Sequence, residues 1–263
     1  MLECVVNVSE GRDDATLAAL ADAAGEDLLD VHVDPHHHRS VFTTVGEEAA
    51  RRLAEVAVAR IDLRDHDGVH PRLGAIDVVP FVALDGSTTA AACAARDAFA
   101  DWAGDELDLP AFAYGGDGPT LPEVRRRAFR DLAPVAGPPV PHPTAGAVAV
   151  GWRPPLVAYN LWLAEPDLAT ARRVAGLVRG DGIRALGLAV GDRVQVSMNL
   201  VEPERVGPAE AWDRVAAHTA VAGAELVGLV PQAVLEAVAP ARWAALDLAP
   251  DTTIEARLAR RDG

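Results

Sequence analysis

Short apolar runs rich in β-branched residues alternate along this chain with longer alanine-rich stretches of helical periodicity. In the C-terminal part the order is β-α-β-β-α-β, which is typical of a ferredoxin-like unit. The predicted elements of that part are 156–163, 167–178, 183–190, 194–201, 209–221 and 225–230. This order restricts the region to an α+β fold in which helices pack on a sheet.

The N-terminal part follows a similar pattern with an additional strand and helix. Its predicted strands are 2–8, 28–33, 40–45 and 76–84, and its predicted helices are 13–24, 47–60 and 87–102. We therefore expect an α+β fold (an α/β sandwich) made of two tandem ferredoxin-like subdomains.

The segment 131–155 separates the two patterns and is rich in proline and glycine. A loop of this length inside a compact protein is usually functional or marks a boundary. We expect the boundary near Trp152 to Pro155, which gives subdomains 1–152 and 153–263. The groove between two such subdomains is the expected ligand site.

Charge and composition exclude several classes of protein. The formal net charge of -15 argues against sequence-independent binding of nucleic acid, which depends on cations that neutralise phosphates. All 24 basic residues are arginine, so the usual Schiff-base, pyridoxal-phosphate and Walker A sites, which need lysine, are excluded. Arginine remains available to bind the carboxylates of a small molecule.

The cysteine content and the N-terminus bear on location. Two cysteines cannot supply a disulfide framework or a zinc cluster by themselves. No apolar run is long enough to span a membrane. We expect no secretion signal, because the first residues show no basic leader followed by an apolar run. We expect a cytoplasmic protein without a membrane partner.

The segment 61–81, IDLRDHDGVHPRLGAIDVVPF, gathers carboxylates, arginines and two histidines. Its glycines and prolines prevent a regular helix, so these groups are expected on an irregular loop between core elements, where sites often lie. His70 is the candidate acid/base group because an imidazole titrates near pH ~6.5. The alternative is that His66 and His70 are loop residues whose rings make local hydrogen bonds.

Two histidine arrangements suggest a metal site, and neither fits one well. His66 and His70 are four residues apart, but a glycine lies between them and a proline follows, which disfavours a zinc-binding helix. The histidines at 36–38 are adjacent, and successive side chains of an extended chain point to opposite sides. We expect no metal. The 36–38 stretch is interpreted either as a solvated loop or as a loop in which Arg39 or one imidazole binds a ligand carboxylate.

The segment 137–146, GPPVPHPTAG, is a further candidate. Its prolines make it stiff, so it would line a channel at a small entropic cost. The alternative interpretation is a linker between the subdomains.

Taken together, several motifs resemble the glutamate formiminotransferase family. They are NVSEGR, LLDVHVDPHHHRSVFTTVG, IDLRDHDGVHPRLGAIDVVPF, AYG, GPPVPHPTAG, LVAYNLWL, VQVSMNL and ELVGLVP, in the order and approximate spacing of that family. The resemblance covers nearly the whole chain and is most specific at GVHPRLGAIDVVPF. It implies transfer of a formimino group from N-formiminoglutamate to the co-substrate tetrahydrofolate, in histidine degradation, usually by a homodimer.

The resemblance also implies roles for particular residues. His70 occupies the histidine of the GxHPR motif, the family's catalytic acid/base. Asn7, Arg39 and Asn160 fall in motifs near the site, and Arg39 and Arg72 are expected to bind substrate carboxylates. The segment that matches the family's folate-lining stretch is Gly137, Pro138, Pro139, Val140, Pro141, His142, Pro143, Thr144, Ala145 and Gly146.

The sequence departs from the family at His32, where aspartate is common, and at His38, where asparagine is common. An aromatic residue of some members' folate-lining segment is replaced by Ala145 and Gly146. The chain resembles the short form without a cyclodeaminase domain. The alternatives kept open are a folate- or anion-binding homologue without transferase activity, a transferase with another formyl or formimino donor, and a metal-dependent hydrolase.

Overall fold

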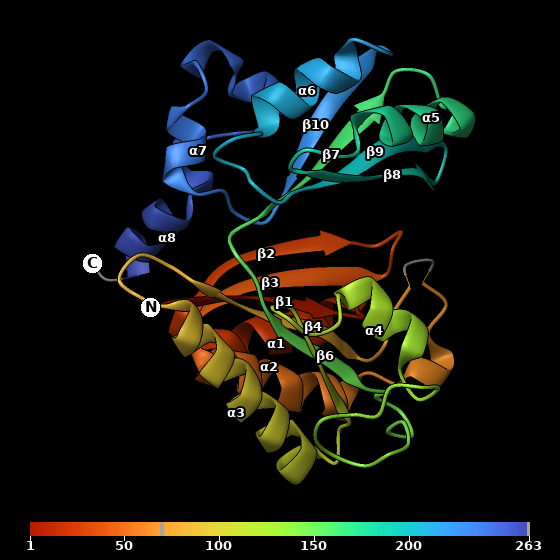
Figure 1. The fold of residues 1–263 in the computed structure, drawn as a ribbon, viewed down its shortest axis with the longest axis vertical. Helices are drawn as coiled ribbons and strands as arrows, with labels where there is room; N and C mark the ends of the chain where they lie inside the picture. Colours follow the sequence, from red (N-terminus) through yellow and green to blue (C-terminus); the bar gives the residue numbers. More distant parts are fainter. Residues whose placement is uncertain (69–70, 262–263) are drawn as a thin grey trace. The chain divides into compact units, whose positions relative to one another are not determined.

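A computed structural model of the chain describes residues 1–68 and 71–261. It divides into two compact units, one over residues 1–154 and the other from residue 155 onward. Each unit packs helices on a β-sheet of its own (Figure 1). The α+β class expected from the sequence is therefore confirmed.

The sheet of the first unit has the strand order β2-β3-β1-β4-β6-β5. These strands are β1 (Leu2–Val8), β2 (Leu28–Asp34), β3 (Arg39–Val45), β4 (Ile76–Ala83), β5 (Ala111–Tyr114) and β6 (Val148–Trp152). β1 pairs antiparallel with β3 and β4, whereas β4, β6 and β5 run parallel to one another. β4 and β6 are buried along most of their length because helices cover both faces of the sheet there.

Long helices pack on one face of this sheet (Figure 1). They are α1 (Asp14–Ala24), α2 (Glu47–Arg60) and α3 (Thr89–Leu107). Their buried alanine and leucine side chains form one core with strand residues such as Phe42 and Phe81. On the opposite face, α4 (Leu121–Arg127) places Val124 against Phe112 of β5. This second, smaller core holds α4 close to the start of β4.

The segment 131–155 is only partly irregular, because β6 lies inside it. The sequence analysis predicted a continuous connection there, and that prediction was wrong. The buried run from Val148 pairs with β4 on one side and with β5 on the other. β6 was not predicted because it is short and lies in a sequence rich in proline and glycine, although it is an interior strand of the sheet.

The second unit has a sheet with the strand order β10-β7-β9-β8, in which all neighbouring pairs are antiparallel. Its strands are β7 (Val157–Leu163), β8 (Ile183–Val190), β9 (Arg193–Leu200) and β10 (Val221–Val227). Its helices are α5 (Leu168–Val178), α6 (Pro208–Ala216), α7 (Gln232–Glu236) and α8 (Ile254–Arg261). The order from β7 to β10 is the predicted β-α-β-β-α-β sequence of elements.

The boundary between the last predicted helix and strand was placed too late. The helix expected over 209–221 ends at Ala216, and β10 begins at Val221 rather than at residue 225. The alanine-rich sequence predicted a longer helix, whereas the chain pairs with β7 as a strand from Val221 onward. Short 3₁₀ helices complete the fold at Gly25–Asp27, Leu63–Asp65, Pro240–Arg242, Ala244–Leu246 and Pro250–Thr252.

In the described part of the chain, no helix combines the length and the apolar character that crossing a membrane requires.

Candidate functional site

A buried charge cluster surrounds Asp77, the second residue of β4. The Asp77 side chain is 1% exposed, and its Oδ2 accepts hydrogen bonds from Arg39 Nη1 at 3.1 Å and from Arg125 Nη2 at 2.6 Å. Its Oδ1 accepts from the backbone N–H of Leu73 at 2.6 Å. One carboxylate therefore binds two guanidinium groups and the loop that precedes β4.

Arg39, the first residue of β3, also contacts β1. Its Nε donates to Asn7 Oδ1 at 3.2 Å, and its Nη2 donates to the same oxygen. Burial lowers the pKa of Arg39, Asp77 raises it, and the charge of Arg125 lowers it again. An arginine nevertheless stays charged at neutral pH. Two residues selected from the sequence, Asn7 and Arg39, are thus brought together by the β1–β3 pairing.

Arg72 lies in the loop before β4, and its Nη2 donates to the carbonyl of Gly68. Burial lowers the pKa of Arg72, and the charges of Asp77 and Asp67 partly offset this effect. Among the described residues, Gly68 is the sole hydrogen-bond partner of this guanidinium. With Arg39 and Arg125, Arg72 gives the cluster three positive charges against the single carboxylate of Asp77.

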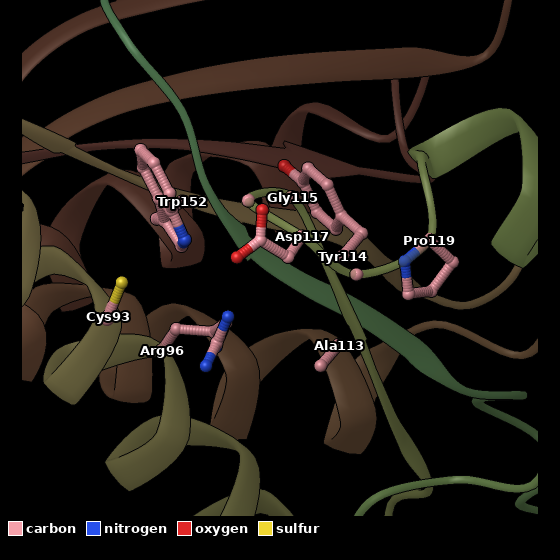
Figure 2. A pocket seen from close by; sticks show the side chains of 10 residues that line it. Cys93, Arg96, Ala113, Tyr114, Gly115, Asp117, Pro119 and Trp152 are labelled. Carbon is pink, nitrogen blue, oxygen red and sulfur yellow. The ribbon is translucent and has the colours of Figure 1, made fainter.

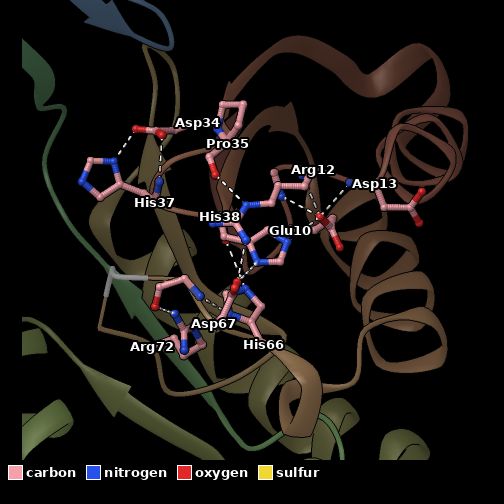
Figure 3. A network of polar contacts seen from close by, with 12 residues as sticks. Glu10, Arg12, Asp13, Asp34, Pro35, His37, His38, His66, Asp67 and Arg72 are labelled. Atoms are coloured by element: carbon pink, nitrogen blue, oxygen red, sulfur yellow. Dashed lines mark hydrogen bonds and ion pairs between the residues drawn. The ribbon is translucent and has the colours of Figure 1, made fainter. Parts of the chain in front are cut away.

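The other end of the same loop contacts a network of histidines and carboxylates (Figure 3). The rings of His66 and His38 stack with centroids 4.0 Å apart. The His66 Nδ1 accepts from the N–H of Gly68 at 3.1 Å, and its Nε2 lies 3.2 Å from the carbonyl of His38. This arrangement fits the tautomer protonated at Nε2. Burial, assisted by the charge of Arg72, lowers the pKa of His66.

For His66, the structure therefore confirms the interpretation that its ring makes local hydrogen bonds. His70 lies outside the described residues. Its role as acid/base stays a prediction, although Gly68 and Pro71 on either side of positions 69–70 are described.

Glu10 connects this network to the start of α1. Its Oε1 accepts from the backbone N–H groups of Gly11, Arg12 and Asp13 at 2.8, 2.8 and 3.0 Å, and it lies 2.9 Å from His38 Nε2. Burial opposes ionisation of Glu10, but these hydrogen bonds prevail and lower its pKa. Glu10 is therefore a carboxylate at neutral pH.

The histidines at 36–38 lie in a turn, not in an extended segment as the sequence argument assumed. His37 Nδ1 contacts the carboxylate of Asp34, and the backbone N–H of His37 donates to the same side chain at 2.9 Å. His38 is bound to Glu10. The solvated-loop interpretation is wrong for these two rings, because the chain's own carboxylates bind them.

The segment 137–146 has two ends with different surroundings. Near its C-terminal end, the carbonyl of Ala145 accepts from the N–H of Ala75 at 2.9 Å, so this end lies along the loop that carries Arg72. At the other end, a Cβ on Gly137 would stand 2.8 Å from the carbonyl of Leu109, next to β5. The folate-lining role of the whole segment stays a prediction.

Asn160 belongs to β7 of the second unit. Its Nδ2 donates to Glu225 Oε2 of the neighbouring strand β10 at 3.1 Å. The structure describes this cross-strand contact, and the part of Asn160 in ligand binding stays a prediction.

A cavity of about 700 Å³ lies in the first unit beyond the carboxyl ends of β5 and β6 (Figure 2). The glycine-rich loop Gly115–Gly118 lines it together with Arg96, Asp117 and Trp152. Burial raises the pKa of Tyr114, whose ring also lines it. None of the sequence-selected site residues that the structure describes line this cavity. The charges of Arg125 and Asp77 do act on the pKa of its Tyr114, so the cavity lies near the Asp77 cluster.

Within the residues that the structure describes, no group of three or more histidine, cysteine, aspartate or glutamate side chains is placed to hold a metal ion. The carboxylates near the loop are instead bound to arginines, histidines and backbone amides.

Two members of the cluster, Asp77 and Arg125, were given no role from the sequence, although Asp77 lies in the segment 61–81 that was singled out. A carboxylate within the apolar run IDVVPF was a usable signal, because a buried charge requires a partner. Nothing in the sequence indicated Arg125, which lies 48 residues from Asp77 and belongs to a helix that was not predicted.

Known proteins resemble this chain over most of its length. Residues 1–153 match the formiminotransferase domain, N-terminal subdomain. A glutamate formimidoyltransferase of Streptococcus pyogenes is 36% identical over 275 residues, which cover 91% of this chain and 92% of that protein.

Two further relatives come from other branches of life. A glutamate formimidoyltransferase of Thermoplasma acidophilum is 34% identical and covers 91% of both chains. A formimidoyltransferase-cyclodeaminase of Sus scrofa is 32% identical over 91% of this chain and 52% of that protein. The resemblance recognised in the sequence motifs is thereby confirmed, and the chain belongs to the formiminotransferase family.

Proposed function

We propose that this chain is a glutamate formimidoyltransferase, which transfers a formimino group from N-formiminoglutamate to tetrahydrofolate in the degradation of histidine. The observation that carries the proposal is the buried carboxylate of Asp77, which binds Arg39 and Arg125 beside the loop that carries Arg72. The family membership of the chain and its match to short glutamate formimidoyltransferases support it.

The reaction requires proton transfer between two nitrogens. A folate nitrogen attacks the formimino carbon, and the resulting tetrahedral carbon carries both the attacking and the departing nitrogen. One proton leaves the attacking nitrogen, and another must reach the amine of the departing glutamate. A single imidazole can do both near neutral pH, which is the role proposed for His70.

The arginine cluster fits the charge of the substrates. Formiminoglutamate and the glutamate tail of folate both carry carboxylates, which a guanidinium binds through two parallel hydrogen bonds. Arg72 has one described acceptor, the carbonyl of Gly68, and so keeps N–H groups that can bind a carboxylate, whereas Arg39 and Arg125 are bound to Asp77. We assign binding of the formiminoglutamate carboxylate to Arg72. Asn7 and Arg39 are assigned the task of stabilising the site beside it.

Other features of the function remain proposals from the family resemblance. They comprise the binding of folate by 137–146 and Asn160, a homodimer and a cytoplasmic location. Light scattering of the purified protein would test the dimer.

The test is an assay with formiminoglutamate and tetrahydrofolate, in which the modified folate is followed by absorbance. His70→Ala is expected to lower kcat by about 10²–10⁴-fold, because one acid/base group contributes that much. His218→Ala, an exposed histidine of the second unit, is the matched control and should retain wild-type kinetics.

Two results would contradict the proposal. One is full activity of His70→Ala. The other is calorimetric binding of folate by the wild type without product from formiminoglutamate, which would select the binding homologue. The melting temperatures of both variants should match that of the wild type, so that a loss of kcat is not a loss of folding.

A further inference from the structure

We infer that Asp77 and Arg125 are positioning residues for the reaction: together they hold the segment Pro71–Leu73, which directly follows His70. This inference rests on the proposed function, and we call the pair the Asp77–Arg125 clamp. The sequence analysis assigned a role to neither residue, and both act through the loop.

The clamp consists of one ion pair that binds the loop at two points. Arg125 of α4 donates from Nη1 to the carbonyl of Pro71 and from Nη2 to Asp77 Oδ2 at 2.6 Å. The other oxygen of Asp77 accepts from the N–H of Leu73 at 2.6 Å. A planar guanidinium and a planar carboxylate thus hold a carbonyl and an amide that are two residues apart.

The end of the loop is held by close backbone packing as well. A Cβ on Gly74 would stand 2.0 Å from the carbonyl oxygen of Ala147, so only glycine allows this approach to the start of β6. Pro71 adds a fixed φ on the other side of the clamp. The path of the chain from Pro71 to Gly74 is therefore strongly determined.

Described contacts also hold the residue before the undescribed pair. The N–H of Gly68 donates to His66, and its carbonyl accepts from Arg72. The catalytic candidate at position 70 therefore lies in a short stretch between two bound positions, Gly68 and Pro71. Catalytic groups must be held to within about 0.5 Å of their productive place, so the contacts of Gly68 and Pro71 bear directly on the role proposed for His70.

Arg125 acts through the loop and not by binding substrate. Both of its terminal nitrogens have protein acceptors, and its side chain is 19% exposed. Arg72 differs, because only its Nη2 is bound among the described residues. The structure thus assigns the two arginines different tasks, positioning for Arg125 and ligand binding for Arg72.

The kinetic test uses Arg125→Ala and Arg125→Lys in the full chain, with Arg126→Ala as the control. Arg126 lies next to Arg125 on α4 and is exposed. Arg125→Ala is expected to lower kcat about 10–100-fold, because a displaced catalytic group costs rate. Arg125→Lys should be intermediate, since an ammonium lacks the planar fork that reaches both acceptors. Arg126→Ala should match the wild type.

Unchanged kcat in Arg125→Ala would overturn the inference, whether or not KM changes. A second measurement does not depend on activity. Hydrogen exchange of the Leu73 amide should accelerate about tenfold or more in Arg125→Ala and stay unchanged in Arg126→Ala. Equal protection of the Leu73 amide in both variants would contradict the inference, even if the enzyme is active. If the wild-type protein has no transferase activity, the proposed function is contradicted, but the exchange result still tests the clamp.

Discussion

The two units of the molecule differ in how deeply their described ion pairs are buried. The first unit buries Asp77 and binds it to Arg39 and Arg125. The second unit keeps its ion pairs at the surface, as in Arg242–Asp213, where the side chains are 39% and 57% exposed. Burying charge is costly, and apolar side chains of similar volume often stabilise a fold as well or better. The cluster of the first unit is therefore not explained by stability alone, which agrees with the role proposed for it.

Substitution of the two aspartates should give the largest contrast between the units. Asp77→Asn leaves two buried guanidinium groups without their carboxylate and is expected to lower the free energy of unfolding by about 3–5 kcal/mol. Asp213→Asn breaks an exposed pair and should lower it by less than about 1 kcal/mol. Urea unfolding of both variants checks this, and equal effects would mean that the Asp77 cluster is not energetically distinct.

Arginine substitutions test whether ligand binding belongs to the first unit. Arg72→Ala is expected to raise KM for formiminoglutamate by about 10–100-fold, because a charged hydrogen bond contributes about 1.5–3 kcal/mol. Arg214→Ala, which removes the pair with Glu210 in the second unit, should leave KM unchanged. Initial rates over a range of substrate concentrations measure both, and a normal KM in Arg72→Ala would exclude its assigned role.

A neutral hydrogen bond of the second unit should have a smaller effect. The buried hydroxyl of Tyr159 donates to the carbonyl of Leu246 at 2.9 Å and links β7 to the C-terminal segment. Tyr159→Phe is expected to cost about 1 kcal/mol of unfolding free energy, because the carbonyl loses its partner, with kcat preserved. Thermal unfolding and the transferase assay together check this. A large loss of activity would show that the second unit takes part in the chemistry more directly than the contrast implies.

The smallest expected effect concerns the loss of unfolding free energy at low pH. Burial raises the pKa of Asp34, but hydrogen bonds from His37 prevail and lower it to about 2. The unfolded chain then binds more protons between pH ~4 and pH ~2, so the contribution of Asp34 is complete above pH ~4 and is lost as pH falls toward 2. Asp34→Asn should reduce the loss of unfolding free energy over this pH range by at most about 1 kcal/mol, since the side chain is partly exposed.

Urea titrations at several pH values would measure the change, with Asp14→Asn, an exposed carboxyl of α1, as the control. A wild-type slope in Asp34→Asn would show that the pairing with His37 does not stabilise the fold.

How much could be predicted depended on whether the signal was local. The β-α-β-β-α-β order of the second unit was visible because each element carries its own periodicity. β6 was missed, because a strand buried on both faces shows no alternation and this one is short. The solvated-loop interpretation of the histidines at 36–38 was wrong for His37 and His38. It assumed extended backbone, whereas a turn lets these two rings reach different carboxylates.

The sequence alone determined the α+β class, the family and the loop that carries the candidate chemistry, because composition, periodicity and motif order are properties of the linear chain. Only the tertiary structure decided which charges share a site. Arg39 and Arg125 lie 38 and 48 residues from Asp77, and they meet it because β1 pairs with both β3 and β4 while α4 packs over the parallel strands. Periodicity indicates which face of an element is buried, but the partner across a sheet depends on strand order, which long connections leave undetermined.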